Sequence, residues 1–221
     1  MIKLTSILLE DERILIPRRS KEERQKNWVI AIRKQVEKYM KDGGEGDLDL
    51  SNTPITSLPQ GLKVGGFLNL KNTKITSLPQ GLEVGGYLYL NNTPITSLPQ
   101  GLKVGGYLYL NNTKITSLPE DLEVGDSLNL SNTKITSLPE DLEVRGSLNL
   151  YNIPITSLPE GLKVEGFLDL SYSSIKKLPQ GLKVGGSLYL NNTSLAKLYT
   201  KEELKKMLPG VRGRIITTNS I

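Results

Sequence analysis

Leucines recur along most of this chain at a fixed spacing of 20 residues. Each copy of the pattern begins with two leucines separated by one residue, such as Leu88 and Leu90, and the residues around them are polar or aromatic. Such alternation over a few positions predicts a short β-strand with one buried face. The pattern runs from Leu48 to Leu195 in eight copies, without an insertion or deletion.

A single copy has too few apolar residues to enclose a core of its own. Its apolar residues must therefore be covered by the equivalent residues of the copies before and after it. The sequence thus predicts a solenoid in which each copy forms one coil. In the third copy the core residues are Leu88, Leu90, Ile95, Leu98, Leu102 and Val104.

Proline, glycine and threonine also recur in each copy at fixed places. Prolines such as Pro99 fix φ where the chain turns away from the strand. Pairs such as Gly85-Gly86 precede the strands, where we expect either a positive φ or close approach between coils. Thr93 and its equivalents follow the strands, and we expect each hydroxyl to bond the backbone of the neighbouring coil.

The motif L-x-L-x-N-T-x-I, followed by L-P-x-G-L, resembles the leucine-rich repeat in its short 20-residue bacterial and phage form. The chain also resembles the repeat portion of type III secreted effectors. The resemblance implies an α/β repeat fold: a right-handed solenoid with a parallel concave sheet and a mostly non-helical convex side, used as a binding scaffold. In this chain threonine follows the strand where the family usually has asparagine, with Ile153 and Ser173 in two copies.

Both flanks of the array break the repeat and predict helical caps, which gives three parts: 1–47, 48–195 and 196–221. Ser20-Lys21-Glu22-Glu23 predicts a capping box and a helix to about Lys41. Its expected inner stripe is Trp28, Ile32, Val36, Tyr39 and Met40.

Thr200-Lys201-Glu202-Glu203 predicts a second capping box, followed by a short helix that contributes Leu204, Met207 and Leu208 to the closing cap. An extended Ile215-Ile216 segment comes after it. The apolar residues within 1–17 are expected to pad the N-terminal cap, and an arm for a partner is the alternative. They are Ile7, Leu8, Leu9, Ile14, Leu15 and Ile16.

The composition excludes several classes of chemistry. The chain has no cysteine and no histidine, so disulfides, cysteine-rich zinc sites, thiol nucleophiles and imidazole bases are absent. The cysteine-dependent ubiquitin ligase domain of some effectors is therefore excluded as well. Acidic residues gather between Glu120 and Glu165, but their spacing matches no calcium-binding loop, and we interpret them as a solvated lateral face. We expect no enzymatic activity, no cofactor and no metal.

We expect no signal peptide in the N-terminal residues, because Glu10 interrupts them before an apolar core reaches working length. No apolar run is long enough to span a bilayer. We therefore expect no membrane partner. The expected location is the cytoplasm, or a host cell reached without a general secretory signal peptide.

Information about a partner is expected at the positions that vary between copies on one face. With the strand leucines buried, the residues before, between and after them point out of the concave sheet. Both phenylalanines and six of the nine tyrosines lie at these positions. An aromatic cluster bordered by asparagine is typical of a recognition surface. The candidate partner-binding residues are Phe67, Asn69, Lys71, Tyr87, Tyr89, Asn91, Tyr107, Tyr109, Asn111, Asn129 and Asn149.

The sequence favours a non-enzymatic protein–protein interaction scaffold, and analogy suggests a host-directed or defence-related role. Binding of a small ligand or glycan in the same concave surface is an alternative. Another is that the aromatic residues only stack as cross-strand ladders.

Nucleic-acid binding is the third alternative and would use the basic ends, because the repeats carry 11 basic against 12 acidic residues. The residues expected on the concave surface include one cation, Lys71, against the three anions Asp47, Asp49 and Asp169. This balance disfavours binding of a phosphate backbone there. The basic residues at the two ends are Arg18, Arg19, Lys21, Arg24 and Lys26, and then Lys197, Lys201, Lys205, Lys206, Arg212 and Arg214.

Overall fold

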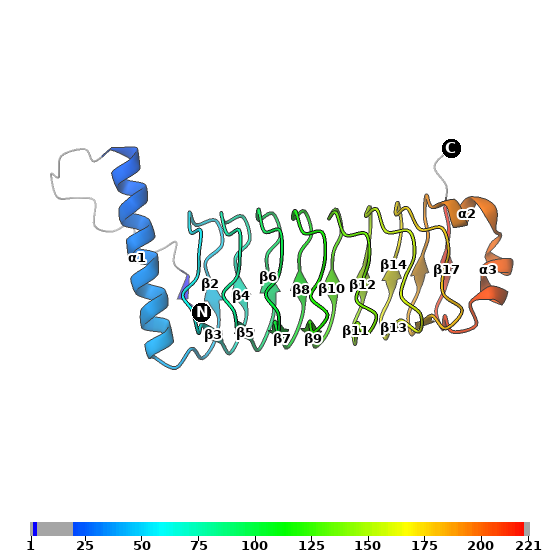
Figure 1. Cartoon of the computed structure of the whole chain (residues 1–221), viewed down its shortest axis with the longest axis horizontal. Coiled ribbons are helices and arrows are strands. Elements are labelled where there is room, and N and C mark those ends of the chain that lie inside the picture. The colour runs from blue at the N-terminus through cyan, green and yellow to red at the C-terminus, as the bar shows by residue number, and fades with distance from the viewer. Residues whose placement is uncertain (1, 4–19, 219–221) are drawn as a thin grey trace.

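The computed structural model of the chain describes residues 2–3 and 20–218 and shows an elongated solenoid (Figure 1). One parallel sheet of ten two-residue strands runs along its whole length. In each of the eight copies, one strand begins at the first leucine of the pair. These eight strands align in register, with Leu88 opposite Leu108. The strands are β1 (Ile2–Lys3), β2 (Leu48–Asp49), β4 (Leu68–Asn69), β6 (Leu88–Tyr89), β8 (Leu108–Tyr109), β10 (Leu128–Asn129), β12 (Leu148–Asn149), β14 (Leu168–Asp169), β16 (Leu188–Tyr189) and β17 (Ile215–Ile216).

Two shorter parallel sheets lie on a second side of the coils. Together we call them the lateral sheets. The first contains β3 (Lys63–Val64), β5 (Glu83–Val84), β7 (Lys103–Val104) and β9 (Glu123–Val124). The second contains β11 (Glu143–Val144), β13 (Lys163–Val164) and β15 (Lys183–Val184).

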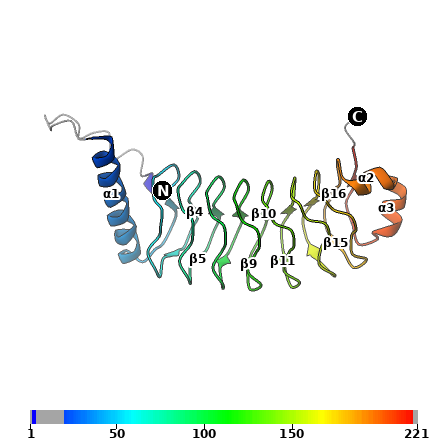
Figure 2. The same ribbon diagram turned by 45° about the horizontal axis from the view of Figure 1, so that its top comes forward.

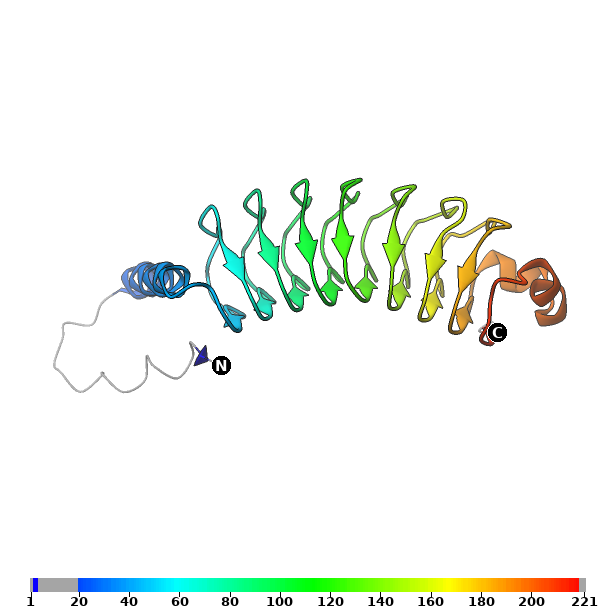
Figure 3. The same cartoon turned by 90° about the horizontal axis from the view of Figure 1, so that it is seen from below.

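The coils follow a shallow arc with the ten-stranded sheet on its inner side (Figures 2 and 3). We therefore call this sheet the concave sheet, as the resemblance implied. The outer side of the arc consists of turns and extended segments without a helix between residues 48 and 193. The sequence-based fold, a leucine-rich-repeat solenoid with a mostly non-helical convex side and helical caps, is confirmed.

One continuous leucine-rich core fills the solenoid from end to end. Leu108 and Leu110 are completely buried, as are their equivalents in the neighbouring coils. Burying each such side chain contributes about 1.5–3 kcal/mol relative to leaving it in water. A coil removed from its neighbours would lose most of this burial, which is why the copies stack.

The threonines act within their own coil rather than between coils, so the prediction for them is wrong. The hydroxyl of Thr93 donates to the carbonyl oxygen of Leu90 at 2.6 Å. The ladder between coils is made by the asparagine that precedes each threonine. The side-chain amide of Asn92 donates to Asn72 Oδ1 at 3.0 Å, and Asn112 donates to Asn92 in the same way.

These ladder asparagines also hold the turn after each strand. Asn92 and Asn112 both have φ near 59°, a left-handed conformation that asparagine adopts more readily than most residues. Tyr172 takes the same conformation in the seventh copy. The ladder runs from Asn52 to Asn152 through Asn72, Asn92, Asn112 and Asn132.

The paired glycines are required by close approach between coils, not by a positive φ. A Cβ on Gly105 would collide with the carbonyl oxygen of Gly85. Gly105 is also not among the residues with positive φ, whereas Gly101 in the preceding turn has φ 68°. Of the two reasons expected from the sequence, only close approach therefore holds for the pairs.

Arg145 stands at one of these close-approach positions, and the lateral sheets are separated there. The N–H of Gly125 donates to Val104 at 2.8 Å. Within the described chain, the corresponding bond from Arg145 to Val124 is missing. Glu165, in the next coil, keeps the bond to Val144 at 3.2 Å. β9 does not pair with β11 at this point. Because Glu165 also has a Cβ at the equivalent position and keeps its bond, the break is associated with Arg145 and not with a Cβ as such.

The predicted helix of the N-terminal cap is α1 (Lys21–Lys41), and both hydrogen bonds of its capping box are present. Ile32 and Val36 are buried in the core, and Trp28, Tyr39 and Met40 pack against it. Strand β1 adds to the edge of the concave sheet at β2. The apolar residues from Ile7 to Ile16 lie outside the described part of the chain.

The C-terminal cap has one helix more than predicted: α2 (Ser194–Leu198), which replaces the convex segment of the eighth copy. The predicted helix is α3 (Lys201–Met207), with its capping box at Thr200. Leu204 and Leu208 of this cap are buried, whereas Met207 is half exposed. Strand β17 pairs with β16 and ends the concave sheet.

Candidate partner-binding surface

Five aromatic side chains form one connected cluster on the concave sheet. We call Phe67, Tyr87, Tyr89, Tyr107 and Tyr109 the aromatic patch. Tyr87 stacks on Tyr107 with ring centroids 4.8 Å apart, and Tyr89 stacks on Tyr109 at 4.9 Å. Within each strand the two tyrosines meet edge to face, and Phe67 meets the edge of Tyr89. The residues that the sequence placed side by side therefore do lie together.

The strand alternation and the glycines position these rings. Leu88 and Leu108 are completely buried beneath the sheet, so Tyr87, Tyr89, Tyr107 and Tyr109 project from its other face. The ring of Tyr87 occupies the space that a side chain on Gly106 would need. The exposed fraction of Tyr87 is 41%. The patch therefore presents a rigid aromatic surface that is still open to contact.

The hydroxyls of Tyr89 and Tyr109 remain protonated at neutral pH. Partial burial raises the pKa of Tyr89 and of Tyr109 above the ordinary value of 10.0, and neighbouring tyrosines raise both further. Asp47 adds to the effect on the pKa of Tyr89, and Asp126 adds to the effect on the pKa of Tyr109. Both hydroxyls are therefore neutral groups that can donate and accept hydrogen bonds.

Three of the candidate asparagines are partly engaged in the turns that follow their strands. Asn69 Oδ1 accepts the N–H of Lys71 at 3.1 Å, and Asn129 and Asn149 bind the residue two positions later in the same way. Their NH₂ groups are the donors left for a partner. The sequence analysis did not identify this turn role, although asparagine before a turn is its usual signal.

The other candidate residues border the patch. Lys71 is exposed and Asn91 and Asn111 are partly exposed, and within the described chain the side chains of Asn91 and Asn111 form no hydrogen bond. Asp47 Oδ1 accepts the N–H of Phe67 at 3.0 Å, and Asp126 Oδ1 accepts the hydroxyl of Ser127 at 3.0 Å. The sequence analysis assigned Asp126 to the lateral acidic face, but its carboxylate accepts the hydroxyl of Ser127, the residue that directly precedes β10 of the concave sheet.

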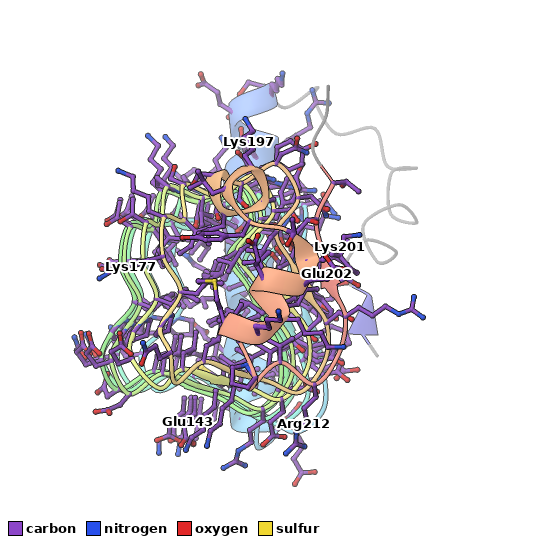
Figure 4. The ribbon with its side chains drawn as sticks, turned by 90° about the vertical axis from the view of Figure 1, so that its right-hand side faces the viewer. Glu143, Lys177, Lys197, Lys201, Glu202 and Arg212 are labelled. Carbon is purple, nitrogen blue, oxygen red and sulfur yellow. The ribbon has the colours of Figure 1, made fainter. Side chains whose placement is uncertain are left out.

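The charged residues of the lateral sheets and of the caps are arranged differently. Lys63 and Glu83 form a salt bridge at 3.0 Å, and Lys103 and Glu123 form one at 2.8 Å. At the C-terminal end, Lys197, Lys201 and Arg212 spread around the cap rather than forming a single stripe (Figure 4). The two basic clusters lie at opposite ends of the solenoid (Figure 1), and Arg18 and Arg19 lie outside the described residues.

Among residues 2–3 and 20–218, no helix is long and apolar enough to cross a membrane. In the same residues, no group of three or more acidic side chains has an arrangement that could hold a metal ion.

Comparisons with known proteins identify the fold. No family model and no curated protein matches the sequence. Among solved structures, the chain is similar to a Shigella effector LRR domain at 20% sequence identity and a TM-score of 0.58. The match covers 87% of this chain and 89% of that chain. This likeness supports the leucine-rich-repeat solenoid over nearly the whole molecule.

Proposed function

We propose that this protein is a non-enzymatic scaffold that binds a partner protein through the concave sheet, with the aromatic patch at the centre of the contact. The observation that carries the proposal is the connected cluster of five rings on a face that no other segment of the described chain covers. The rings are fixed by mutual stacking, so a partner would bind them without a large loss of side-chain entropy.

The composition of the surface supports a protein partner. Tyrosine is among the residues that most often dominate the free energy of protein–protein binding, and truncation of one such residue costs about 2 kcal/mol or more. The asparagine NH₂ groups and the tyrosine hydroxyls supply hydrogen-bonding groups at the border. Tyr87, Tyr89, Tyr107 and Tyr109 are the proposed anchors, and Phe67, Asn69, Lys71, Asn91, Asn111, Asn129 and Asn149 are the proposed peripheral contacts.

The proposal includes a host-directed or defence-related role. It rests on analogy alone, since the similar Shigella protein is an effector. The absence of histidine and cysteine from the sequence supports the non-enzymatic part of the proposal.

Affinity capture from a host-cell extract tests the proposal. The wild-type protein is compared with a variant in which Tyr87, Tyr89, Tyr107 and Tyr109 are replaced by alanine. A control variant replaces Lys63, Glu83, Lys103 and Glu123, which are exposed on the lateral sheet of the same coils. Circular dichroism and thermal unfolding establish that all three proteins are folded.

We expect the wild type and the lateral control to retain the same partner and the tyrosine variant to lose it. Retention of the same proteins by all three folded forms would show that the tyrosines only stabilise the sheet. Loss of the partner from the lateral control alone would indicate that the partner binds the lateral sheet, which would contradict the proposal.

A further inference from the structure

Carboxylates stand at both ends of the aromatic patch along the solenoid axis. Asp47 and Asp49 belong to the first coil, immediately before Phe67. Asp126 precedes β10 in the fifth coil, which lies next to the coil that carries Tyr107 and Tyr109. The register of the concave sheet aligns Asp49 with Asn69 and Tyr109 with Asn129.

These carboxylates are not neutralised within the described chain. Asp47, Asp49 and Asp126 each use Oδ1 to accept one hydrogen bond from a backbone N–H or a hydroxyl. No lysine or arginine forms a salt bridge with any of the three there. The lateral sheets differ, because Lys63–Glu83 and Lys103–Glu123 neutralise each other across neighbouring strands.

The last two rings of the patch each have one face that no other ring covers, and Asp126 accepts the hydroxyl of Ser127 in the next coil, whose strand pairs with β8. Tyr87 covers one face of Tyr107, and Tyr89 covers one face of Tyr109. The next coil carries Ser127 and Asn129, so no third ring follows in either stack. An open tyrosine face next to a carboxylate is a favourable place for a planar cation, which gains both a cation–π contact and a charge-assisted hydrogen bond.

We propose that the aromatic patch binds a cationic segment of its partner, with an arginine at each end, one at Asp47 and Asp49 and the other at Tyr109 and Asp126. This inference rests on the proposed function and specifies the chemistry of the partner. Arginine fits better than lysine because its guanidinium stacks flat on a ring while it donates to a carboxylate.

The geometry also sets the distance between the two cations. The stacked rings repeat every 4.8 to 4.9 Å along the solenoid. From the first coil to the fifth this corresponds to about 19 Å, which an extended chain crosses in about six residues. The partner segment is therefore expected to run along the solenoid axis, with apolar residues over the rings between its two arginines.

A defined peptide tests this inference without the natural partner. The probe is acetyl-RSLGLSR-amide, whose arginines are six positions apart, and its control carries citrulline in place of both arginines. Citrulline keeps the planar shape and removes the charge. Binding is followed by the shifts of backbone amide NMR signals from residues 67–71, 87–91 and 107–111.

We expect the arginine peptide to bind at least about tenfold more tightly than its citrulline control. Replacing Asp47, Asp49 and Asp126 together by asparagine keeps all three Oδ1 acceptors and should remove this difference. Asp121→Asn with Asp141→Asn, which removes two charges from the turns beside the lateral sheets, should leave the difference unchanged.

Equal affinity for the two peptides, no shifts in the patch, or an arginine preference that survives replacement of Asp47, Asp49 and Asp126 by asparagine would each overturn the inference. These results are distinguishable from failure of the proposed function. If the peptides bind alike but the tyrosine variant still loses its captured partner, the surface is a binding site for a partner of different chemistry.

Discussion

The concave sheet and the lateral sheets are built by the same coils, yet their exposed residues are of opposite kinds. On the first lateral sheet, lysine and glutamate alternate from coil to coil and form the pairs Lys63–Glu83 and Lys103–Glu123. On the concave sheet of the same coils, the exposed rows contain stacked tyrosines and carboxylates that have no salt bridge within the described residues. The charges of the first lateral sheet are paired without a partner, whereas the concave row gains from one. This difference is the main reason to propose that binding occurs on the concave side.

The two kinds of sheet also tolerate substitution differently. The concave sheet is continuous through ten strands and accepts aspartate, asparagine or tyrosine between its paired leucines. The lateral sheets have glycine beside most of their strands and separate at Arg145, whereas Glu165 at the equivalent position leaves β11 and β13 paired. The lateral side is therefore sensitive to which side chain replaces the glycine.

Among the substitutions that test this comparison, we expect Gly105→Ala to lower the stability of the protein most. The added Cβ would collide with the carbonyl oxygen of Gly85, and we expect a loss of about 1–3 kcal/mol in the free energy of unfolding. Denaturant unfolding measures the loss. Gly65→Ala is the matched control, because its nearest neighbour would be 3.4 Å away, and it should change stability by less than about 0.5 kcal/mol. Equal effects would contradict the close-approach explanation.

Asn112→Ala should cause the next largest loss of stability. Alanine would be strained at the positive φ of this position, and it cannot form the ladder hydrogen bonds. Asn112 has φ 59° and bonds Asn92 and Asn132 through its side chain. We expect a loss of about 1–2 kcal/mol, measured by the same unfolding experiment. Asn112→Gly relieves the backbone strain and should cost less. If glycine costs as much as alanine, the backbone conformation contributes nothing and the hydrogen bonds account for the whole effect.

Arg145→Gly should act in the opposite direction. Removing the side chain allows β9 and β11 to pair, and we expect a gain of about 0.5–1.5 kcal/mol, the usual net contribution of one hydrogen bond. Slower hydrogen exchange at the amide of residue 145 would report the new bond. Unchanged exchange and stability would show that the separation has another cause.

The smallest expected effect is on the pH dependence of stability, and it involves residues of the concave sheet only. The folded-state pKa values of Tyr89 and Tyr109 are raised, mainly because partial burial disfavours the tyrosinate. Their stabilising contribution is therefore complete below about pH 10 and is lost as the pH rises through the folded-state values. Tyr89→Phe with Tyr109→Phe should make the decline in thermal stability above pH 10 shallower. Tyr172→Phe, outside the patch, is the control, and an equal change there would contradict the assignment.

The repeat period predicted most of the fold, because a 20-residue repeat with buried leucines has few ways to fill a core. Leu88, Leu90 and their equivalents lie where the period placed them. The two capping boxes likewise predicted α1 and α3, since both hydrogen bonds of each box depend on residues three positions apart. Helix α2 was missed because Ser194 to Leu198 form it only against the cap that follows.

Contacts between coils were harder to predict from one copy. The asparagine ladder depends on which side chain of the Asn-Thr pair points toward the neighbouring coil, and the backbone conformation of Asn92 decides this. The aromatic patch was predicted by position, but the engagement of Asn69 Oδ1 by Lys71 and the hydrogen bond between Asp126 and Ser127 depend on side-chain directions. No period in the sequence reports these directions.

Site-specific photocrosslinking compares the two sides most directly. A benzophenone amino acid replaces Tyr109 on the concave sheet in one protein and Lys103 on the lateral sheet in another, and both are irradiated in a host-cell extract. We predict a discrete adduct with one partner protein from position 109 and none from position 103. An adduct from position 103 alone, or the same adducts from both positions, would contradict the assignment of binding to the concave sheet.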